Sequence, residues 1–152
     1  MPRLITSATA MTKVPSFHAT GNNGAYGQNS PVVFNTVVFD NMGGYDTTNM
    51  RYYSQLSGKY LISVNMGIVR YENNENGYPR LVKNSNSHIY YAYVAQGNTG
   101  DPGSQYQSVC MSIILDLAYG DYVWVQFNQG NSDYYQNQQE LRFCGQWIAP
   151  LD

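Results

Sequence analysis

The side chains that could carry out chemistry are few in this chain of 152 residues. The chain has two histidines and two cysteines: His18, His88, Cys110 and Cys144. None of them has a second metal ligand at the short paired spacing that zinc sites show. Motifs for a catalytic serine elbow, a phosphate-binding loop or dinucleotide binding are absent. The carboxylates Glu72 and Glu75 lie in a polar segment, where solvated groups are expected, so the sequence predicts that this protein is not an enzyme.

The composition argues against two classes of partner. Only 12% of the residues are charged and the formal net charge is −2, so the chain offers no basic patch for the phosphates of a nucleic acid. No apolar run is long enough to span a membrane. The first 15 residues contain Arg3 and Lys13 but lack the long apolar segment of a secretory signal. Because no Asn-x-Ser/Thr sequon occurs, the sequence favours a microbial or viral source.

Tyrosine is the unusual component, with 15 residues set among many Asn, Gln, Ser and Gly. Tyrosine suits strands, and with small polar residues it suits adaptable recognition surfaces. We expect most of the tyrosines to be half-buried strand residues. The candidate recognition surfaces are the polar segments 71–78, 97–106 and 131–138, where tyrosine rings with few charges suit neutral sugars or a protein surface. The candidate ligand-binding residues are Tyr71, Tyr78, Tyr106, Tyr134 and Tyr135.

Strands are expected to position these segments. Apolar residues recur at every second position in 59–69 and 111–117, which is typical of a strand with one buried face. After a turn at Gly120-Asp121, the segment 122–127 continues this pattern. Other strands are expected, between Gly-, Asn- and Pro-rich turns, at 16–20, 31–40, 50–55, 78–84, 88–96 and 140–149. No capped helix and no internal repeat occurs, so the chain is predicted to be all-β, a sandwich or jelly roll.

The end of the chain carries a resemblance to a known family. The patterns LxxGDxVWVQ at 117–126 and FxGxxIxP at 143–150 resemble the complement C1q globular head, of the TNF-like superfamily. Five upstream segments resemble the same domain in the same order: 16–19, 31–34, 41–46, 58–63 and 81–84. The departures are Tyr52, where the family usually has Phe, and 54–58, which replaces its CPxPG. The resemblance implies a ten-stranded TNF/C1q-like jelly-roll sandwich at 16–152, after a linker or stem end at 1–15.

The resemblance also implies a homotrimer around a threefold axis. The strands that this family uses for assembly carry apolar residues opposite their core-facing stripe, and contiguous apolar surface of this kind marks an interface. The predicted interface residues are Leu61, Ile114 and Ile148. In the resembling fold, the strands of Cys110 and Cys144 lie on either side of strand 59–69. They are too far apart for a disulfide, so both cysteines are expected to be free thiols.

Some members of this family bind calcium near the trimer apex, through the loop that precedes the last block of strands. Here that loop is 101–107, and Asp101 and Gln107 match positions used there. One carboxylate with amide and carbonyl oxygens makes a poor calcium site, although three chains would triple the ligands. An ordinary polar loop is the favoured interpretation, and no cofactor is expected.

Two functions remain open. The favoured hypothesis is a non-enzymatic, trimeric recognition head, outside the cell or on a virion surface, that binds a cell-surface glycan or protein. It would form the tip of a phage tail fibre or of a microbial surface fibre. The alternative is a structural trimerisation or folding cap with no ligand of its own. A secreted animal C1q-domain protein is the alternative source, and neither hypothesis involves nucleic acid or membrane insertion.

Overall fold

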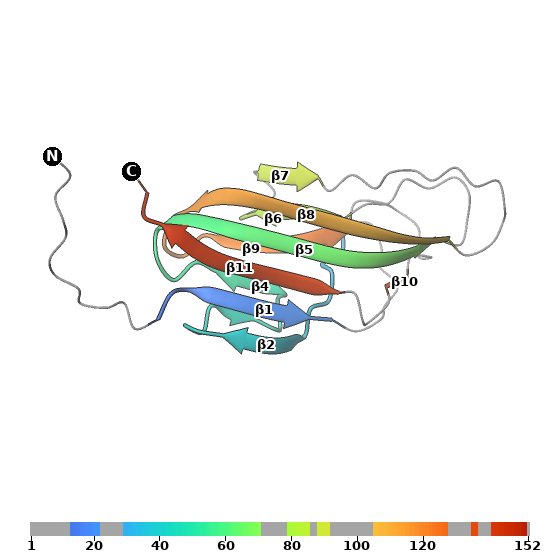
Figure 1. Cartoon of the computed structure of the whole chain (residues 1–152), viewed down its shortest axis with the longest axis horizontal. Coiled ribbons are helices and arrows are strands. Elements are labelled where there is room, and N and C mark those ends of the chain that lie inside the picture. Colours follow the sequence, from blue (N-terminus) through green and yellow to red (C-terminus); the bar gives the residue numbers. More distant parts are fainter. Residues whose placement is uncertain are drawn as a thin grey trace, which may run out of the picture.

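The computed structural model describes residues 13–21, 29–70, 79–85, 88–91, 105–127, 135–136 and 141–151. These residues form eleven strands and no helix, arranged as two antiparallel sheets packed face to face (Figure 1). The prediction of an all-β jelly-roll sandwich is therefore confirmed. The sequence did not suggest two short strands. They are β3 (Tyr45–Asp46), in a segment expected to turn, and β10 (Tyr135–Gln136), inside a segment expected to be a loop.

The first sheet has the spatial order β10-β5-β11-β1-β2, with β8 also paired to β5. Its strands are β1 (Ser16–Thr20), β2 (Thr36–Asp40), β5 (Gly58–Arg70), β8 (Gln105–Leu117), β10 (Tyr135–Gln136) and β11 (Arg142–Ala149). The second sheet has the order β3-β4-β9-β6-β7. Its strands are β3 (Tyr45–Asp46), β4 (Arg51–Tyr53), β6 (Pro79–Lys83), β7 (His88–Tyr91) and β9 (Tyr122–Phe127).

The alternating pattern of β5 produces the central strand of the first sheet. Its inward residues are fully or almost fully buried: Tyr60, Ile62, Val64 and Met66. On one side β5 pairs with β8 from Gly58↔Leu117 to Arg70↔Gln105, and on the other it pairs with β11. Because side chains alternate between faces, this register also sets which residues of the three strands point outward.

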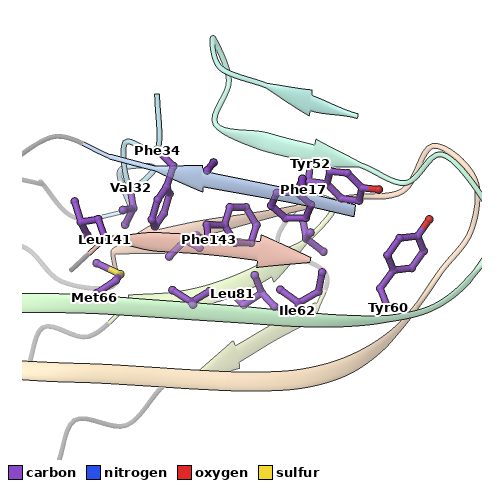
Figure 2. Close-up of a cluster of buried hydrophobic side chains, with 14 of the residues drawn as sticks. Phe17, Val32, Phe34, Tyr52, Tyr60, Ile62, Met66, Leu81, Leu141 and Phe143 are labelled. Carbon is purple, nitrogen blue, oxygen red and sulfur yellow. The ribbon is translucent and has the colours of Figure 1, made fainter. Parts of the chain in front are cut away.

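Aromatic rings from both sheets meet in the core between the layers (Figure 2). The ring of Phe17 stacks on that of Tyr52, with centroids 4.1 Å apart, and meets Phe143 edge-on at 4.9 Å. Gly145 makes room for this cluster, because a Cβ atom there would lie 2.3 Å from the Phe17 ring. A larger residue at 145 would have to displace a ring from a close-packed interior.

The segment 31–40 was predicted to be one strand, and that prediction is wrong. Its beginning runs beside β9 in the second sheet, where Val32 donates a backbone hydrogen bond to Val125 at 2.9 Å. Its end is β2, which pairs with β1 in the first sheet. Between them the chain crosses the core, and both Val32 and Phe34 are buried on the way. The apolar run of 31–34 therefore reflects burial in a crossing segment rather than a strand face.

The predicted turn between β8 and β9 is present and is linked to β6. Gly120 has the positive φ of 83° that the turn needs. The Asp121 carboxylate accepts hydrogen bonds from the Ala118 backbone N–H at 3.0 Å and from Asn84 Nδ2 at 2.9 Å. It also pairs with Lys83 at 2.9 Å. Burial alone would raise the pKa of Asp121, but these hydrogen bonds and the lysine lower it below its ordinary value.

Candidate assembly and ligand-binding surfaces

The outer face of the first sheet carries side chains in transverse rows set by the strand register. One row runs from Ser16 through Gln146 and Leu61 to Ile114. The next row runs from Phe39 on β2 through His18, Cys144 and Ser63 to Ser112 on β8, and the Ser63 and Ser112 hydroxyls lie 2.8 Å apart. We call this surface the first outer face. Small side chains fill the centre of its second row, and larger apolar ones border them.

The three predicted interface residues are apolar and solvent-accessible in the single chain. Leu61 is 40% exposed, Ile114 is 57% exposed and Ile148 is 43% exposed. Leu61 and Ile114 are direct cross-strand partners on the first outer face. Apolar side chains gathered on one sheet face, opposite the core, have the character of a contact surface.

The edge strand β2 extends this apolar surface, and the sequence analysis missed it. Val37, Val38 and Phe39 are exposed one after another on this strand. An edge strand with exposed apolar residues is prone to pair or pack with another chain. The available signal was the run of three apolar residues without alternation, which a strand with a single buried face would not show.

A hollow of about 490 Å³ opens on the first outer face between β2, β1, β11 and β5. Phe39 and Leu61 are among its largest apolar side chains, and Ser63, Cys144 and Gly145 lie between them. Ser63 and Cys144 point outward with short side chains, and Gly145 has none, which explains why the surface is concave here. The hollow has the size to accept an apolar side chain from another molecule.

His18 lies on the first outer face without a partner for one ring nitrogen. Its Nε2 atom is buried and makes no hydrogen bond, and its ring meets that of Phe39 edge-on at 5.9 Å. Burial first, and the nearby charge of Arg142 second, lower the pKa of His18 below its ordinary value of 6.5. The neutral imidazole is therefore the favoured form in the folded chain.

Both cysteines are free, as predicted. Cys110 of β8 faces Asn65 of β5, and Cys144 of β11 faces Ser63 of the same strand. The strand β5 thus separates them, as the resemblance implied. Burial raises the pKa of the Cys144 thiol, with Arg142 acting in the opposite direction, so it is protonated at neutral pH.

Most of the predicted ligand-binding and calcium residues lie outside the described part of the chain. This holds for Tyr71, Tyr78, Asp101 and Tyr134. Tyr106 and Gln107 lie in β8, and Tyr135 lies in β10 rather than in a loop. Tyr106 and Tyr135 both pair with Val69, on opposite sides of β5, so the fold brings two of the candidate tyrosines to one row. Among the described residues, no group of three or more His, Cys, Asp or Glu could hold a metal ion.

The outer face of the second sheet carries a group that the sequence analysis did not single out. Across β4 and β9, Arg51 pairs with Trp124 and Tyr53 pairs with Tyr122. The guanidinium carbon of Arg51 lies 4.6 Å from the ring centroid of Tyr122 and 5.5 Å from that of Trp124. The rings of Tyr53 and Tyr122 are 5.3 Å apart. We call Arg51, Tyr53 and Tyr122 the arginine–tyrosine shelf.

The alternation along β4 and β9 was the signal for this shelf. Tyr52 and Val123 are core residues, so the neighbours on either side of each must point away from the core. The sequence did not show that the two strands pair with each other. Without the pairing, Arg51 and Tyr122 are unrelated positions in distant segments.

The other end of the second sheet's outer face is held by internal hydrogen bonds. Arg80 donates from Nε to Gln126 Oε1 at 2.7 Å and from Nη2 to Asn29 Oδ1 at 2.9 Å. Gln126, which is only 2% exposed, donates from Nε2 to the Asn29 carbonyl at 2.8 Å. These bonds tie the start of the crossing segment to β9 and β6.

Comparison with known proteins identifies the family. The family model of the C1q domain matches residues 16–148. A comparison with curated protein sequences found no relative. Within the described residues, no helix has the length and apolar character to cross a membrane.

Solved structures share this fold at low sequence identity. The globular domain of zebrafish complement 1qA superposes with a TM-score of 0.66 at 21% identity, covering 90% of this chain and 99% of that one. Eiger TNF from S. frugiperda gives 0.67 at 14% identity, covering 91% and 95%. Murine APRIL gives 0.64 at 13% identity, covering 90% and 100%. With its sequence match over most of its length and its two-sheet sandwich, this chain belongs to the C1q domain family.

Proposed function

We propose that this domain is a trimeric recognition head that acts outside the cell or on a virion surface. C1q and TNF-like domains generally form trimeric ligand-binding heads, and they are typically recognition domains rather than enzymes. Their homologues are secreted or extracellular. The trimer, its ligand and its location are the parts that we propose for this chain.

The observation that carries the proposal is the first outer face. Leu61 on β5 and Ile114 on the neighbouring strand β8 form an exposed apolar pair on this face, and Ile148 and the β2 edge extend it. Scattered apolar residues are normal on a monomer, but these gather on one side of one sheet. A closed ring of three copies would cover that side while leaving the second sheet in contact with solvent. In this arrangement the hollow beside Phe39 and Leu61 takes a side chain of the neighbouring copy.

The proposed ligand is a cell-surface glycan or protein. Tyr71, Tyr78, Tyr106, Tyr134 and Tyr135 remain the candidate ligand contacts, two of them on strands, and Asp101 with Gln107 remains a candidate calcium position. Residues 1–15 would then be a stem end, with the recognition domain at 16–152. The absence of sequons favours the tip of a phage tail fibre or of a microbial surface fibre as the source.

A glycan array, run with a sample whose mass has been measured, tests the recognition function. Reproducible hits by a trimeric sample support a ligand-binding head. A trimer that binds no glycan and no cell-surface protein would instead be a structural cap.

A double variant separates loop contacts from structural tyrosines. Tyr134 and Tyr135 are set among Ser, Asp, Asn and Gln, a poor environment for a core. Replacing both by Ala should remove ligand binding and leave the thermal midpoint nearly unchanged, as substitutions at exposed positions usually do. If this variant unfolds or loses its oligomeric state, the two tyrosines are structural, and their assignment as ligand contacts is wrong.

A further inference from the structure

Arg51 in the arginine–tyrosine shelf has no anionic partner in the part of the chain that the structure describes. Its Nε atom is buried and makes no hydrogen bond. The ion pairs between described residues are Lys59–Asp116 and Lys83–Asp121, and neither involves this arginine. A guanidinium presents its donors in a planar fork that matches the two oxygens of a carboxylate. The shelf therefore holds the cationic half of such a pair.

The nearest acidic residue is engaged elsewhere. Asp46 faces Arg51 across β3 and β4, but its Oδ1 accepts the backbone N–H of Thr48 at 2.8 Å and its Oδ2 accepts Asn49 Nδ2 at 2.6 Å. The bonds from Asn49 and Thr48, and to a smaller extent the charge of Arg51, lower the pKa of Asp46, so it stays ionised. The charge of Asp46 thus weakens the positive potential of the shelf, but Asp46 does not form an ion pair with the Arg51 guanidinium. A bare anion gains little there, and a suitable ligand must also contact the rings.

The tyrosines supply that contact. Tyr53 and Tyr122 are half-buried, and their rings are inclined by 48° with centroids 5.3 Å apart. Within the described residues, neither phenolic hydroxyl has a hydrogen-bond partner. An aromatic ring offers an apolar face for the C–H groups of a sugar, and its hydroxyl bonds the polar edge. Trp124 is only 8% exposed, and its ring packs against the Arg51 guanidinium.

Arg80 shows what an arginine with a structural role looks like on the same sheet face. Its Nε and Nη2 atoms both donate to neutral acceptors of the same chain, Gln126 and Asn29. Arg51 instead lies over aromatic rings and makes no such bond. The two arginines carry the same charge, so Arg80 provides a matched control.

We propose that the arginine–tyrosine shelf binds the carboxylate-bearing ring of an acidic saccharide. The Arg51 guanidinium bonds the carboxylate, while Tyr53 and Tyr122 contact the sugar ring and its hydroxyls. This inference rests on the proposed recognition function and names its ligand class. Because the shelf lies on the second sheet, assembly through the first outer face leaves it open, and a trimer presents three copies.

An NMR titration of the intact protein with three small probes tests this assignment. Glucuronic acid has both the ring and the carboxylate, glucose has only the ring, and acetate has only the carboxylate. Only glucuronic acid should shift the Arg51 side-chain Nε–H signal at low concentration, with glucose and acetate each at least about tenfold weaker, since a charged hydrogen bond contributes about that factor. Equal binding of glucose, or tighter binding of acetate, would overturn the proposal.

Variants then locate the site. Arg51→Gln should weaken glucuronic acid binding by about tenfold or more. Arg51→Lys keeps the cation over the rings and so protects the fold, but it loses the planar fork and should also weaken binding. Arg80→Gln removes the same charge from the same sheet face and should leave the affinity unchanged. If Arg80→Gln weakens binding as much as Arg51→Gln, the effect is general electrostatics and the assignment is wrong.

The failure of this inference and the failure of the proposed function have different signatures. A trimer that binds only neutral glycans on the array keeps the recognition function and refutes the acidic-saccharide site. A protein that proves to be monomeric refutes the trimeric head, whatever the titration shows. Selective binding of glucuronic acid that is lost in Arg51→Lys and retained in Arg80→Gln supports the site.

Discussion

The two outer faces of the sandwich belong to different sheets. In both sheets side chains alternate between the core and the outer face, but the outward side chains differ in chemistry. On the first sheet, the outward residues of β5 and β8 include short or aliphatic ones such as Ser63, Leu61 and Ile114. On the second sheet they are Arg51, Tyr53 and other polar or aromatic groups that contact one another. Removing an apolar face from water lowers the free energy. A polar aromatic face, in contrast, can bind a ligand and stay exposed to water. This difference is the basis for the proposed assembly through the first sheet and the proposed recognition through the second.

The largest effect is expected from a charge on the first outer face. Ile114→Asp places a carboxylate at an exposed apolar position. If an interface buries this position, the charge would be buried without a partner, which is strongly unfavourable. The mass in solution should fall from that of three chains to that of one, as measured by light scattering. Tyr119→Asp, at an exposed position in the turn after β8, is the control and should keep the larger mass. A trimer that survives Ile114→Asp would remove this face from the assembly.

The rates at which the two cysteines are alkylated show whether other copies of the chain cover the same face. Cys110 is exposed in the single chain, whereas Cys144 is half-buried and its pKa is raised by burial. If three copies cover the first outer face, alkylation of Cys110 in the native protein should be slow, and several-fold faster in Ile114→Asp. Mass spectrometry after timed alkylation gives both rates. Equally fast modification of Cys110 in both proteins would mean that this part of the face stays open.

A substitution on the second sheet should change stability without changing the assembly. Gln126→Leu removes the acceptor of Arg80 Nε and the donor to the Asn29 carbonyl, which leaves polar groups unpaired. The expected loss is about 1–3 kcal/mol in urea unfolding, with the mass unchanged. Gln146→Leu, on the first outer face, should not lower the stability. The comparison of the two sheets breaks down if Gln126→Leu dissociates the protein or Gln146→Leu destabilises it.

The smallest expected effect is on how stability depends on pH. His18 on the first sheet and Asp121 in the turn after β8 should affect stability in different pH ranges. The folded-state pKa of His18 is lowered, so the unfolded chain binds the proton more tightly. The stability that neutral His18 contributes is present above pH 6.5 and is lost as the pH falls from 6.5 toward the folded-state pKa. The pKa of Asp121 is also lowered, so its contribution is present above pH 3.8 and is lost below it. In thermal melts, His18→Asn should remove the dependence of the thermal midpoint on pH only in the first of these ranges.

The sequence predicted the alternating strands well because their pattern is local. The inward stripe of β5 and the turn at Gly120 follow from neighbouring residue types. The family motifs added the order of the sheets and the place of Cys110 and Cys144. The crossing of 31–34 between the sheets was missed, because burial on all sides and burial on one side look alike in a short apolar run.

The surfaces were predicted less completely than the fold. Leu61, Ile114 and Ile148 were predicted as interface residues because they interrupt an alternating pattern, and all three are exposed in the single chain. The shelf was missed, because the contact between Arg51 and Tyr122 depends on the pairing of β4 with β9. Pairing between distant strands is set by the whole fold, and neither segment contains a signal for it.

Light scattering of the intact protein at micromolar concentration tests the assignment of the first outer face most directly. If that face assembles three copies, the measured mass should be near three times the chain mass of 17.1 kDa. A mass near 17.1 kDa would contradict it, because the exposed apolar face would then stay open to solvent.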